Sequence, residues 1–277
     1  QQVTRRFYHD VNDKEGIRSN SIYSLLIDDR GAVWVGHFQA GLDYSLYQNG
    51  LFRTYDYPPL FNSANLSIRS FVNKGQEKVI GSRDGLFYIN EATGVVKSFV
   101  KPVLTSDLIL TICFYQGEYY IGTYGGGMMV LNPETLSLKY FAQGDTELFQ
   151  KGHIFCVKPD AKGNLWIGTS QGLFSYNGQT KQIKSFTSAN SQLPEGNVYE
   201  VSFDSTGKGW IATETGMCIY DPASQSLRSN VFPEGFVNKD KVRTIYEDAE
   251  HNLYFIREKG SLFTSTLTMD RFQNRSI

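Results

Sequence analysis

The sequence lacks any long hydrophobic run. No stretch approaches the roughly 20 apolar residues that a membrane-spanning helix needs. No targeting signal is recognisable either, and the chain begins with Gln1 and Gln2, not with Met. A processed or excised piece would begin in this way. An export signal could have been removed from it, so the missing signal does not decide the compartment.

An excess of charge of either sign is also missing, since 27 Lys and Arg are matched by 28 Asp and Glu. Nucleic-acid-binding proteins usually carry a basic excess or stripe, because contacts to phosphate dominate their affinity. The composition therefore argues against a nucleic-acid partner and indicates a soluble surface of mixed charge.

Cysteine is scarce, with only Cys113, Cys156 and Cys218 in the chain. They lie far apart inside apolar, strand-like runs, and no C-x2-C pair of the kind that binds zinc is present. The sequence predicts buried thiols that behave as small hydrophobic groups. A disulfide between two of them remains open at this stage.

Aromatic residues and glycine are plentiful. Aromatics make up 14% of the 277 residues, and 26 Gly stand against 8 Pro. This composition favours many short strands joined by tight turns. The hydrophobic share of 40% is that of a globular chain.

A short motif recurs every 41 to 46 residues, about 44 on average. It is an aromatic or apolar anchor, then a β-branched or apolar residue, and then often Gly. A period of this length, built from short strands, is the size of one β-propeller blade. The six occurrences are Trp34-Val35-Gly36, Val79-Ile80-Gly81, Tyr120-Ile121-Gly122, Trp166-Ile167-Gly168, Trp210-Ile211-Ala212 and Tyr254-Phe255-Ile256.

Each repeat reads as four strands. An apolar inner strand precedes the anchor, and the anchor lies on the second strand. A turn that recurs in every repeat then leads into a third and a fourth strand. Four repeats place an Asp-led turn with Gly or Asn before the anchor, which suits capping of turn amides. A second Gly follows every anchor at a turn that is predicted to need positive φ. These six glycines are Gly41, Gly85, Gly127, Gly172, Gly216 and Gly260.

The predicted fold is an all-β propeller of four-stranded antiparallel blades, in one domain covering 1–277. Because one such sheet cannot bury both faces, neighbouring blades must stack, and the anchors are expected to pack between them. An extra outer strand is expected within 1–9. Six blades could close with an irregular seam, or the array could be part of a seven-bladed one. The predicted blades are 17–55, 65–99, 107–141, 152–186, 196–230 and 240–274.

The fullest copy of the motif runs from Asp160 through Gly163, Trp166 and Gly168 to Leu173, and Asn20 to Leu42 repeats it. This pattern resembles the two-component regulator propeller repeat. The resemblance covers essentially the whole chain and implies the extracytoplasmic sensor of a hybrid two-component system. It further implies an oligosaccharide ligand, a periplasmic location, a homodimer in the full-length protein, and no catalysis in this segment. Kinase chemistry and any membrane helix would lie in segments that are not part of this chain.

Ligands of propellers usually bind where loops converge on one rim. We call the rim the set of turns between second and third strands, together with the loops between blades. Its polar and aromatic residues suit hydrogen bonds to sugar hydroxyls and stacking on a sugar face. The candidate ligand-binding residues are His37, Phe38, Gln39, Arg83, Asp84, Tyr124, Gln171, Glu214, Arg257 and Glu258.

Two other functions stay open. The long loops 56–65 and 143–152 contain apolar residues that could either mark a protein contact, as in a dimerisation scaffold, or tuck onto the rim. A propeller lyase or glycosidase would need two carboxylates in one pocket, for which Glu214 and Glu258 on neighbouring blades are candidates. We expect no catalytic residues and no cofactor. We also expect no metal site, since His9 and His37 lie about three blades from His153.

Overall fold

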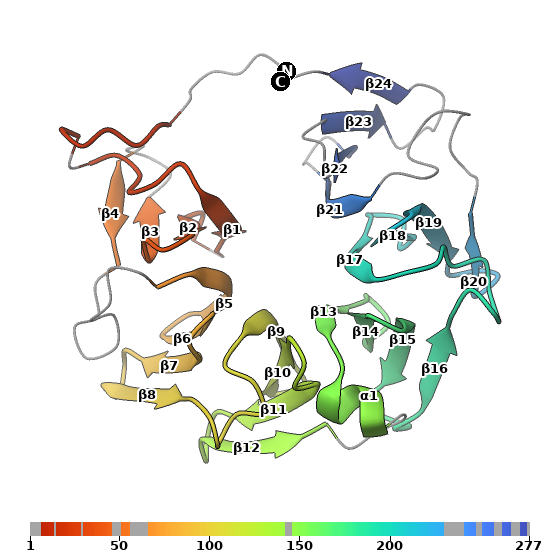
Figure 1. Ribbon diagram of the computed structural model, residues 1–277, viewed down its shortest axis with the longest axis horizontal. Helices are drawn as coiled ribbons and strands as arrows, with labels where there is room; N and C mark the ends of the chain where they lie inside the picture. Colours follow the sequence, from red (N-terminus) through yellow and green to blue (C-terminus); the bar gives the residue numbers. More distant parts are fainter. Residues whose placement is uncertain are drawn as a thin grey trace. The chain divides into compact units, whose positions relative to one another are not determined.

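The computed structural model describes most of the chain (Figure 1). It separates into two compact units, Gln1–Phe114 and Tyr115–Ile277. No helix in the described part is long and apolar enough to cross a bilayer. The described residues are 7–13, 15–28, 30–45, 51–55, 66–141, 146–229, 241–247, 251–257, 262–266 and 272–275.

Unit 1 contains the first two four-stranded sheets, and β9 (Ile109–Tyr115) begins near its end. In each sheet every strand pairs antiparallel with the next along the chain. The first sheet comprises β1 (Ile22–Ile27), β2 (Val33–His37), β3 (Leu42–Ser45) and β4 (Phe52–Thr54). The second comprises β5 (Ile68–Lys74), β6 (Glu77–Ser82), β7 (Leu86–Asn90) and β8 (Val95–Phe99).

Unit 2 continues the same pattern. The third sheet has the order β12-β11-β10-β9, and three more four-stranded sheets follow. The other strands of the third sheet are β10 (Glu118–Thr123), β11 (Met128–Asn132) and β12 (Ser137–Tyr140). The fourth sheet comprises β13 (Ile154–Pro159), β14 (Asn164–Thr169), β15 (Gly172–Asn177) and β16 (Ile183–Phe186), and the fifth comprises β17 (Val198–Phe203), β18 (Gly209–Thr213), β19 (Gly216–Asp221) and β20 (Ser226–Arg228). The sixth comprises β21 (Val242–Glu247), β22 (Asn252–Arg257), β23 (Leu262–Thr266) and β24 (Phe272–Arg275).

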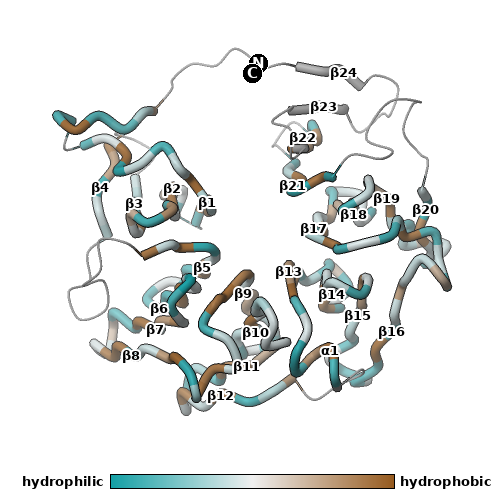
Figure 2. Tube along the Cα trace, viewed as in Figure 1, coloured by the Kyte–Doolittle hydropathy of each residue, from teal (hydrophilic) through white to brown (hydrophobic). Residues whose placement is uncertain are grey.

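These six described sheets confirm the predicted all-β fold of four-stranded antiparallel propeller blades. Hydrophobic residues dominate inner strands such as β9 (Figure 2). The prediction of a single domain over 1–277 stays a prediction. Most of the expected extra strand within 1–9 falls outside the described residues, and residues 7–9 form no regular element.

The Asp-led turns hold the tryptophan anchors in place. In each of three sheets, one carboxylate oxygen accepts backbone amides of the turn and the other accepts the indole N–H of the Trp six residues later. This double role confirms the predicted turn chemistry and ties it to the core. The Oδ2–Nε1 distances are 2.9 Å for Asp28–Trp34, 2.9 Å for Asp160–Trp166 and 2.8 Å for Asp204–Trp210.

Adjacent sheets in unit 2 bury the anchors between them. Trp166 is 1% exposed and packs in one cluster with Val198 and Val201 of β17. Trp210 packs in the same way with Val242 and Ile245 of β21. The anchors therefore fill the space between neighbouring blades, as predicted.

The turn after each second strand needs glycine. Gly172 and Gly216 have φ of 127° and 138°, which residues with a side chain rarely adopt. A Cβ on Gly172 would also lie 2.5 Å from the carbonyl oxygen of Phe186. The predicted positive φ is confirmed at the five described glycines of this set, whereas Gly260 lies outside the described residues.

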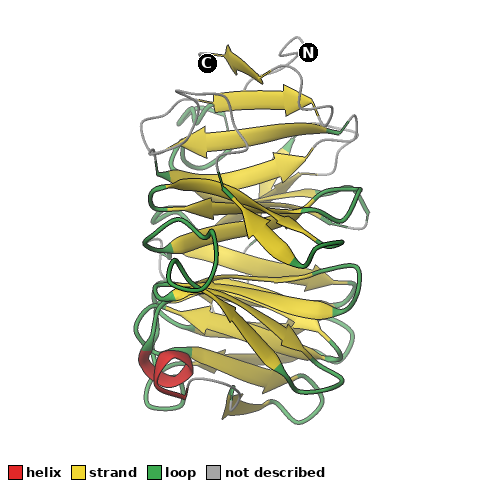
Figure 3. Ribbon diagram, turned by 90° about the vertical axis from the view of Figure 1, so that its right-hand side faces the viewer, coloured by secondary structure: helices red, strands yellow, loops and turns green. Residues whose placement is uncertain are grey.

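One helix interrupts the strands, α1 (Thr146–Lys151), shown in red in Figure 3. The sequence did not predict it. Its Leu148 and Phe149 are 1% and 0% exposed, and Phe149 packs edge-on against Phe141 and Phe174. The apolar residues of loop 143–152 are thus tucked in and do not form a surface for another protein. The other loop, 56–65, lies outside the described residues.

The three cysteines are buried and free. The prediction of buried thiols is confirmed, and the alternative of a disulfide is wrong for this structure. Burial raises the pKa of the Cys156 and Cys218 thiols, so both stay protonated and unreactive.

Candidate functional site

A bulge interrupts the same place in five of the inner-strand pairings. The register shifts between the first and third residues of β1, β5, β13, β17 and β21. A bulge inserts one extra residue into a strand, and the side chain of that residue no longer follows the alternation between the two faces of the sheet. The five residues at the bulge are Tyr23, Arg69, Phe155, Tyr199 and Arg243.

The bulge lies at the rim end of each sheet. In the fifth sheet, Val198 pairs with Thr213, the last residue of β18, and the rim residue Glu214 follows directly. The side chain of Tyr199 therefore reaches Glu214, with 2.7 Å between the phenol oxygen and Oε2. Inner strands thus contribute to the rim alongside the turns.

In unit 2 the rim carries a continuous row of rings, which we call the aromatic belt: Tyr124, His153, Phe155 and Tyr199. The ring of Tyr124 stacks on His153 with a centroid distance of 4.0 Å. Phe155 lies 6.2 Å from His153 and 5.1 Å from Tyr199. Tyr124 is 50% exposed and the other three rings are half-buried, so each ring keeps part of its surface accessible to solvent.

Polar groups surround the Tyr199 end of the belt. Asn197 Nδ2 and the Tyr199 hydroxyl both donate to Glu214 Oε2, at 2.6 and 2.7 Å. Lys241 Nζ lies 3.2 Å from the other oxygen, Oε1. The guanidinium of Arg243 lies over the Tyr199 ring at 4.4 Å. With Phe155 of the fourth sheet, side chains of three successive sheets therefore meet around Tyr199.

This environment stabilises the charged form of Glu214. The hydrogen bond from Tyr199 lowers the pKa of the carboxyl, partial burial raises it, and Lys241 and Asn197 lower it further, for a net decrease. Glu214 is therefore ionised at neutral pH. A carboxylate with this set of donors is a poor general acid, because giving it a proton breaks the bonds that hold it.

The lowered pKa predicts a pH effect on stability. The folded pKa of Glu214 lies below its ordinary value of 4.5, so its contribution is complete above that value and is lost as pH falls through the folded pKa. We expect the melting temperature of the wild type to fall more steeply below pH 4.5 than that of Glu214→Gln. Thermal unfolding from pH 7 to pH 3.5 measures this difference. Identical pH profiles for the two proteins would contradict the prediction.

The rim of unit 1 carries a smaller aromatic group. Tyr23, 46% exposed, lies 5.2 Å from the ring of Phe38, and the guanidinium of Arg69 lies 4.8 Å from the Tyr23 centroid. The predicted candidate Phe38 is half-buried, so part of its ring is open to solvent. Gln39 beside it is exposed, with φ of 55°.

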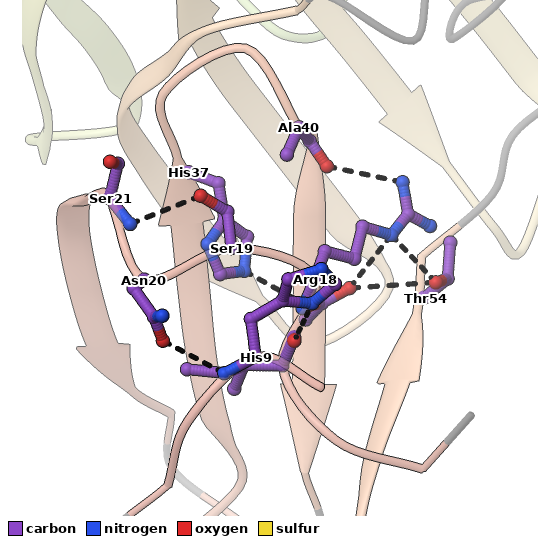
Figure 4. Close-up of polar contacts among 10 residues, drawn as sticks. His9, Arg18, Ser19, Asn20, Ser21, His37, Ala40 and Thr54 are labelled. Atoms are coloured by element: carbon purple, nitrogen blue, oxygen red, sulfur yellow. Dashed lines mark hydrogen bonds and ion pairs between the residues drawn. The ribbon is translucent and has the colours of Figure 1, made fainter. Parts of the chain in front are cut away.

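His37 was predicted to lie on the rim surface, but the structure buries it. Its side chain is fully buried, and Nε2 lies 2.9 Å from Asp43 Oδ2 (Figure 4). Arg18 reaches the same carboxylate through its backbone N–H and through Nε, 3.1 Å from Oδ1, and also donates to Thr54 and the Ala40 carbonyl. The cluster ties the segment before β1 to the first sheet. His37 is therefore a structural residue, and its exposure was wrongly predicted.

The other candidates remain at their turns. Arg83, Asp84 and Gln171 are exposed, and the backbone amides of Asp84 and Gln171 are held by Ser82 and Thr169 hydroxyls at 2.9 and 3.0 Å. For Arg257 only the backbone, at the end of β22, is described, and Glu258 lies outside the described residues. The proposed approach of Glu214 to Glu258 is thus a prediction only.

The described residues hold no group of three or more His, Cys, Asp or Glu that could bind a metal ion. His9 Nδ1 contacts the Ile17 carbonyl oxygen at 3.0 Å, and His153 stacks in the belt. Sequence reasoning missed the five bulge residues, because strict alternation gives no reason to place them on the rim. Their signal is chemical: each one follows the Ile or Val that begins its inner strand, and each is large and aromatic or cationic.

Comparisons with known proteins agree with the repeat. Residues 16–39 and 149–171 match the family model of the two-component regulator propeller. This confirms the resemblance found in the sequence. No curated protein sequence matches this chain.

Solved structures share the fold. The extracellular domain of the hybrid two-component system BT3049 from B. thetaiotaomicron is 22% identical with a TM-score of 0.75, over 91% of this chain and 34% of that one. The corresponding domain of BT4673 from the same organism is 16% identical with a TM-score of 0.62, over 94% and 39%. YCF48 bound to a D1 peptide is 13% identical with a TM-score of 0.65, over 96% and 85%. This chain spans little more than a third of the two B. thetaiotaomicron domains.

Proposed function

We propose that this chain, which carries two-component regulator propeller repeats, is the extracytoplasmic ligand-sensing propeller of a two-component signalling protein. Its ligand is an oligosaccharide, its compartment the periplasm, and this segment performs no catalysis. The extracellular domains that share its fold support this reading, and the site itself supplies the argument for the ligand.

The aromatic belt is the observation that carries the proposal. Rings of aromatic side chains present flat apolar faces, and their polar edges bond to neighbours, so they suit ligands that are partly apolar and partly polar. The faces of sugar rings have this character. Tyr124 and Phe155 come from different sheets of one unit, so successive rings could receive successive sugars of a chain.

The absence of catalysis rests on Glu214. Glycosidases need one carboxyl that gives up a proton and a second carboxylate nearby. Glu214 is held ionised by Tyr199, Asn197 and Lys241, which suits a positioning role. We therefore expect oligosaccharides to be recovered intact after incubation with the chain.

Truncation of a belt ring is expected to weaken binding. The test begins with a thermal-shift screen of neutral and acidic oligosaccharides, followed by calorimetry with the best one. A ligand present at 100 times its Kd stabilises a protein by about 2.7 kcal/mol, which a melting curve resolves. Tyr124→Ala should raise the Kd about 5- to 10-fold, because one stacking contact of roughly 1 kcal/mol is lost.

Tyr140→Ala is the matched control. Tyr140 is 49% exposed, close to the 50% of Tyr124, but lies on the outer strand β12 away from the belt. Its removal should leave the Kd unchanged. If no oligosaccharide shifts the melting temperature and the chain self-associates in sedimentation, the protein is a scaffold. If cleaved products appear and vanish with Glu214→Gln, it is an enzyme.

A further inference from the structure

A cavity of about 750 Å³ lies between the fourth and fifth sheets, at the end of the strands opposite the rim. Its volume falls within the range of roughly 300–1,000 Å³ that is usual for ligand pockets. The Asp-led turns of both sheets border it, and aromatic rings and short polar groups share its lining. We call it the turn cavity. The lining residues used below are Trp166, Ser175, Phe203, Gly207, Tyr220 and Pro222.

A small residue leaves this space open. In each sheet one residue of the third strand pairs with the anchor, and in the fourth sheet Ser175 pairs with Trp166. The first sheet has Tyr44 at this position, and its ring stacks on Trp34 at a centroid distance of 5.1 Å. Every other sheet also carries a larger side chain than serine here, so the anchor of the fourth sheet has the least cover. The remaining counterparts are Tyr88, Val130, Ile219 and Thr264.

A tyrosine fills the equivalent place between the third and fourth sheets. Tyr115 lies six residues after the start of β9, as Asp160 lies six residues after the start of β13. The ring of Tyr115 is edge-on to the anchor Tyr120 at a centroid distance of 5.5 Å. Its hydroxyl donates to the Gly163 carbonyl at 2.7 Å and accepts from the Gly178 amide at 3.1 Å. A phenol ring is therefore a group that this fold accommodates between two adjacent sheets.

The turn cavity presents part of the same bonding pattern. Gly207 is the counterpart of Gly163 in the fifth sheet, and among the described residues its carbonyl oxygen has no hydrogen-bond partner. Pro222 is the counterpart of Gly178, since each directly follows the last residue of its third strand. Proline has no N–H to donate. A ligand group that donates, such as a phenol hydroxyl, therefore suits this place better than one that only accepts.

Aromatic side chains supply the walls of the cavity. The rings of Tyr220 and Phe203 lie 4.5 and 5.7 Å from the Trp166 ring, centroid to centroid. Both are half-buried, so part of each ring is open to the cavity. Among the described residues, the hydroxyls of Ser175 and Tyr220 have no hydrogen-bond partner, so they can bond to the polar part of a ligand. Tilted and offset ring contacts of this kind are favourable for a further aromatic ring.

We propose that the turn cavity is a binding site for a phenol ring. The ring packs against the aromatic walls, its hydroxyl donates to the Gly207 carbonyl, and the rest of the ligand fills the volume beside Ser175. A free phenolic compound and a tyrosine side chain of another polypeptide both carry this chemistry. Such a site goes beyond the proposed function, because the aromatic belt lies at the other end of the strands.

The experiment compares ligands that differ at the ring hydroxyl alone. Ligand-observed NMR titrations measure the Kd of N-acetyl-tyrosine amide, its O-methyl ether and N-acetyl-phenylalanine amide. We expect the tyrosine amide to bind with a Kd below about 1 mM, as suits a ligand of this size. It should bind about 5-fold more tightly than the other two, because only its ring can donate a hydrogen bond.

Two further probes distinguish the sources of the phenol. One is tyrosol, a free phenolic alcohol, and the other is the peptide acetyl-Phe-Tyr-Gln-Gly-Glu-amide, which copies residues 114–118 of this chain. A lower Kd for the peptide than for tyrosol supports a tyrosine of another polypeptide. Equal or tighter binding of tyrosol supports a free phenolic compound.

Variants then locate the site. Ser175→Tyr closes the cavity with the ring that the first sheet carries at this position, so it should weaken binding of the tyrosine amide by about 10-fold or more. Ser185→Tyr is the matched control, because Ser185 is exposed on β16 and does not line the cavity. Phe203→Leu removes one ring of the wall and should weaken binding about 3- to 5-fold. It provides a second test should Ser175→Tyr fail to fold, which melting curves check.

The outcomes are separable from those of the sensing proposal. Equal affinity of the three amides, no binding at about 10 mM, or the same Kd for Ser175→Tyr and Ser185→Tyr overturns the inference. Tyr124→Ala should leave the Kd of the tyrosine amide unchanged, and Ser175→Tyr should leave that of the oligosaccharide unchanged. If Ser175→Tyr instead abolishes oligosaccharide binding, the turn cavity holds the glycan and the phenol site is wrong.

Discussion

Replacing Asp204 by alanine should lower the free energy of unfolding by about 3 kcal/mol. Asp204 is 5% exposed and accepts hydrogen bonds from the Thr206 and Lys208 amides, the Thr206 hydroxyl and Trp210 Nε1. Without it, the indole N–H of Trp210 is buried with no acceptor, which costs roughly 1–3 kcal/mol, and the loss of the turn cap adds about 1 kcal/mol. Urea unfolding followed by tryptophan fluorescence measures the change.

Asp221→Ala is the matched control for this substitution. Asp221 also accepts turn amides, from Ala223 and Ser224, but it holds no tryptophan and lies at the surface. Its replacement should shift the urea midpoint far less than Asp204→Ala. Equal shifts for the two variants would show that the bond to the anchor adds nothing beyond the turn.

Gly168→Val should be at least as damaging, with a loss of about 3 kcal/mol or more. A Cβ at this position would lie 2.5 Å from Cys156 Sγ and 2.8 Å from the carbonyl oxygen of Val198, the first residue of the next inner strand. Two sheets approach each other closely here, so the larger side chain must force them apart. Overpacking of a core typically costs about 1–3 kcal/mol, and the backbone contact adds to that.

Ala223→Val provides the comparison for Gly168→Val. Ala223 lies at an exposed turn of the same unit, where added bulk meets solvent. We expect a melting temperature within about 2 °C of the wild type for Ala223→Val and a large decrease for Gly168→Val. A Gly168→Val protein as stable as the wild type would mean that neighbouring sheets yield easily to one another.

The repeat made most of the fold predictable. The anchors, the Asp-led turns and the positive-φ glycines are dictated by local physics, and the structure places Trp166, Asp160 and Gly172 as expected. The Gly of the anchor motif also has a physical reason, because Gly168 lies against the next blade. Helix α1 was not predictable, because its packing onto Phe141 and Phe174 decides its conformation.

The candidate site was predictable only in part. Tyr124 and Glu214 were found because turn residues of a propeller gather at one rim, whereas Tyr199 and Arg243 were missed. A bulge is a property of strand pairing and leaves no periodic trace in the sequence. His37 was misplaced because it departs from its repeat together with Asp43. The equivalent residues in the fourth sheet are Thr169 and Phe174, a turn hydroxyl and a buried apolar ring.

Two positions that differ from the repeat together, as His37 and Asp43 do, can be recognised in the sequence. A histidine and an aspartate that replace a hydroxyl-bearing and an apolar residue on the two strands of one hairpin indicate a buried hydrogen-bonded pair. Each alone would leave a polar group without a partner in the core. Comparing the repeats position by position would have identified the cluster around Asp43 from the sequence.

The bulge also separates two kinds of evolutionary constraint. The first residue of four of the five bulged inner strands, such as Val198 or Val242, is fully buried, so exchanging it disturbs the packing between blades. The next residue faces the rim and can change from phenylalanine to tyrosine to arginine without such a cost. Substitutions at these positions can therefore alter the rim surface one blade at a time, while the packing between blades stays intact.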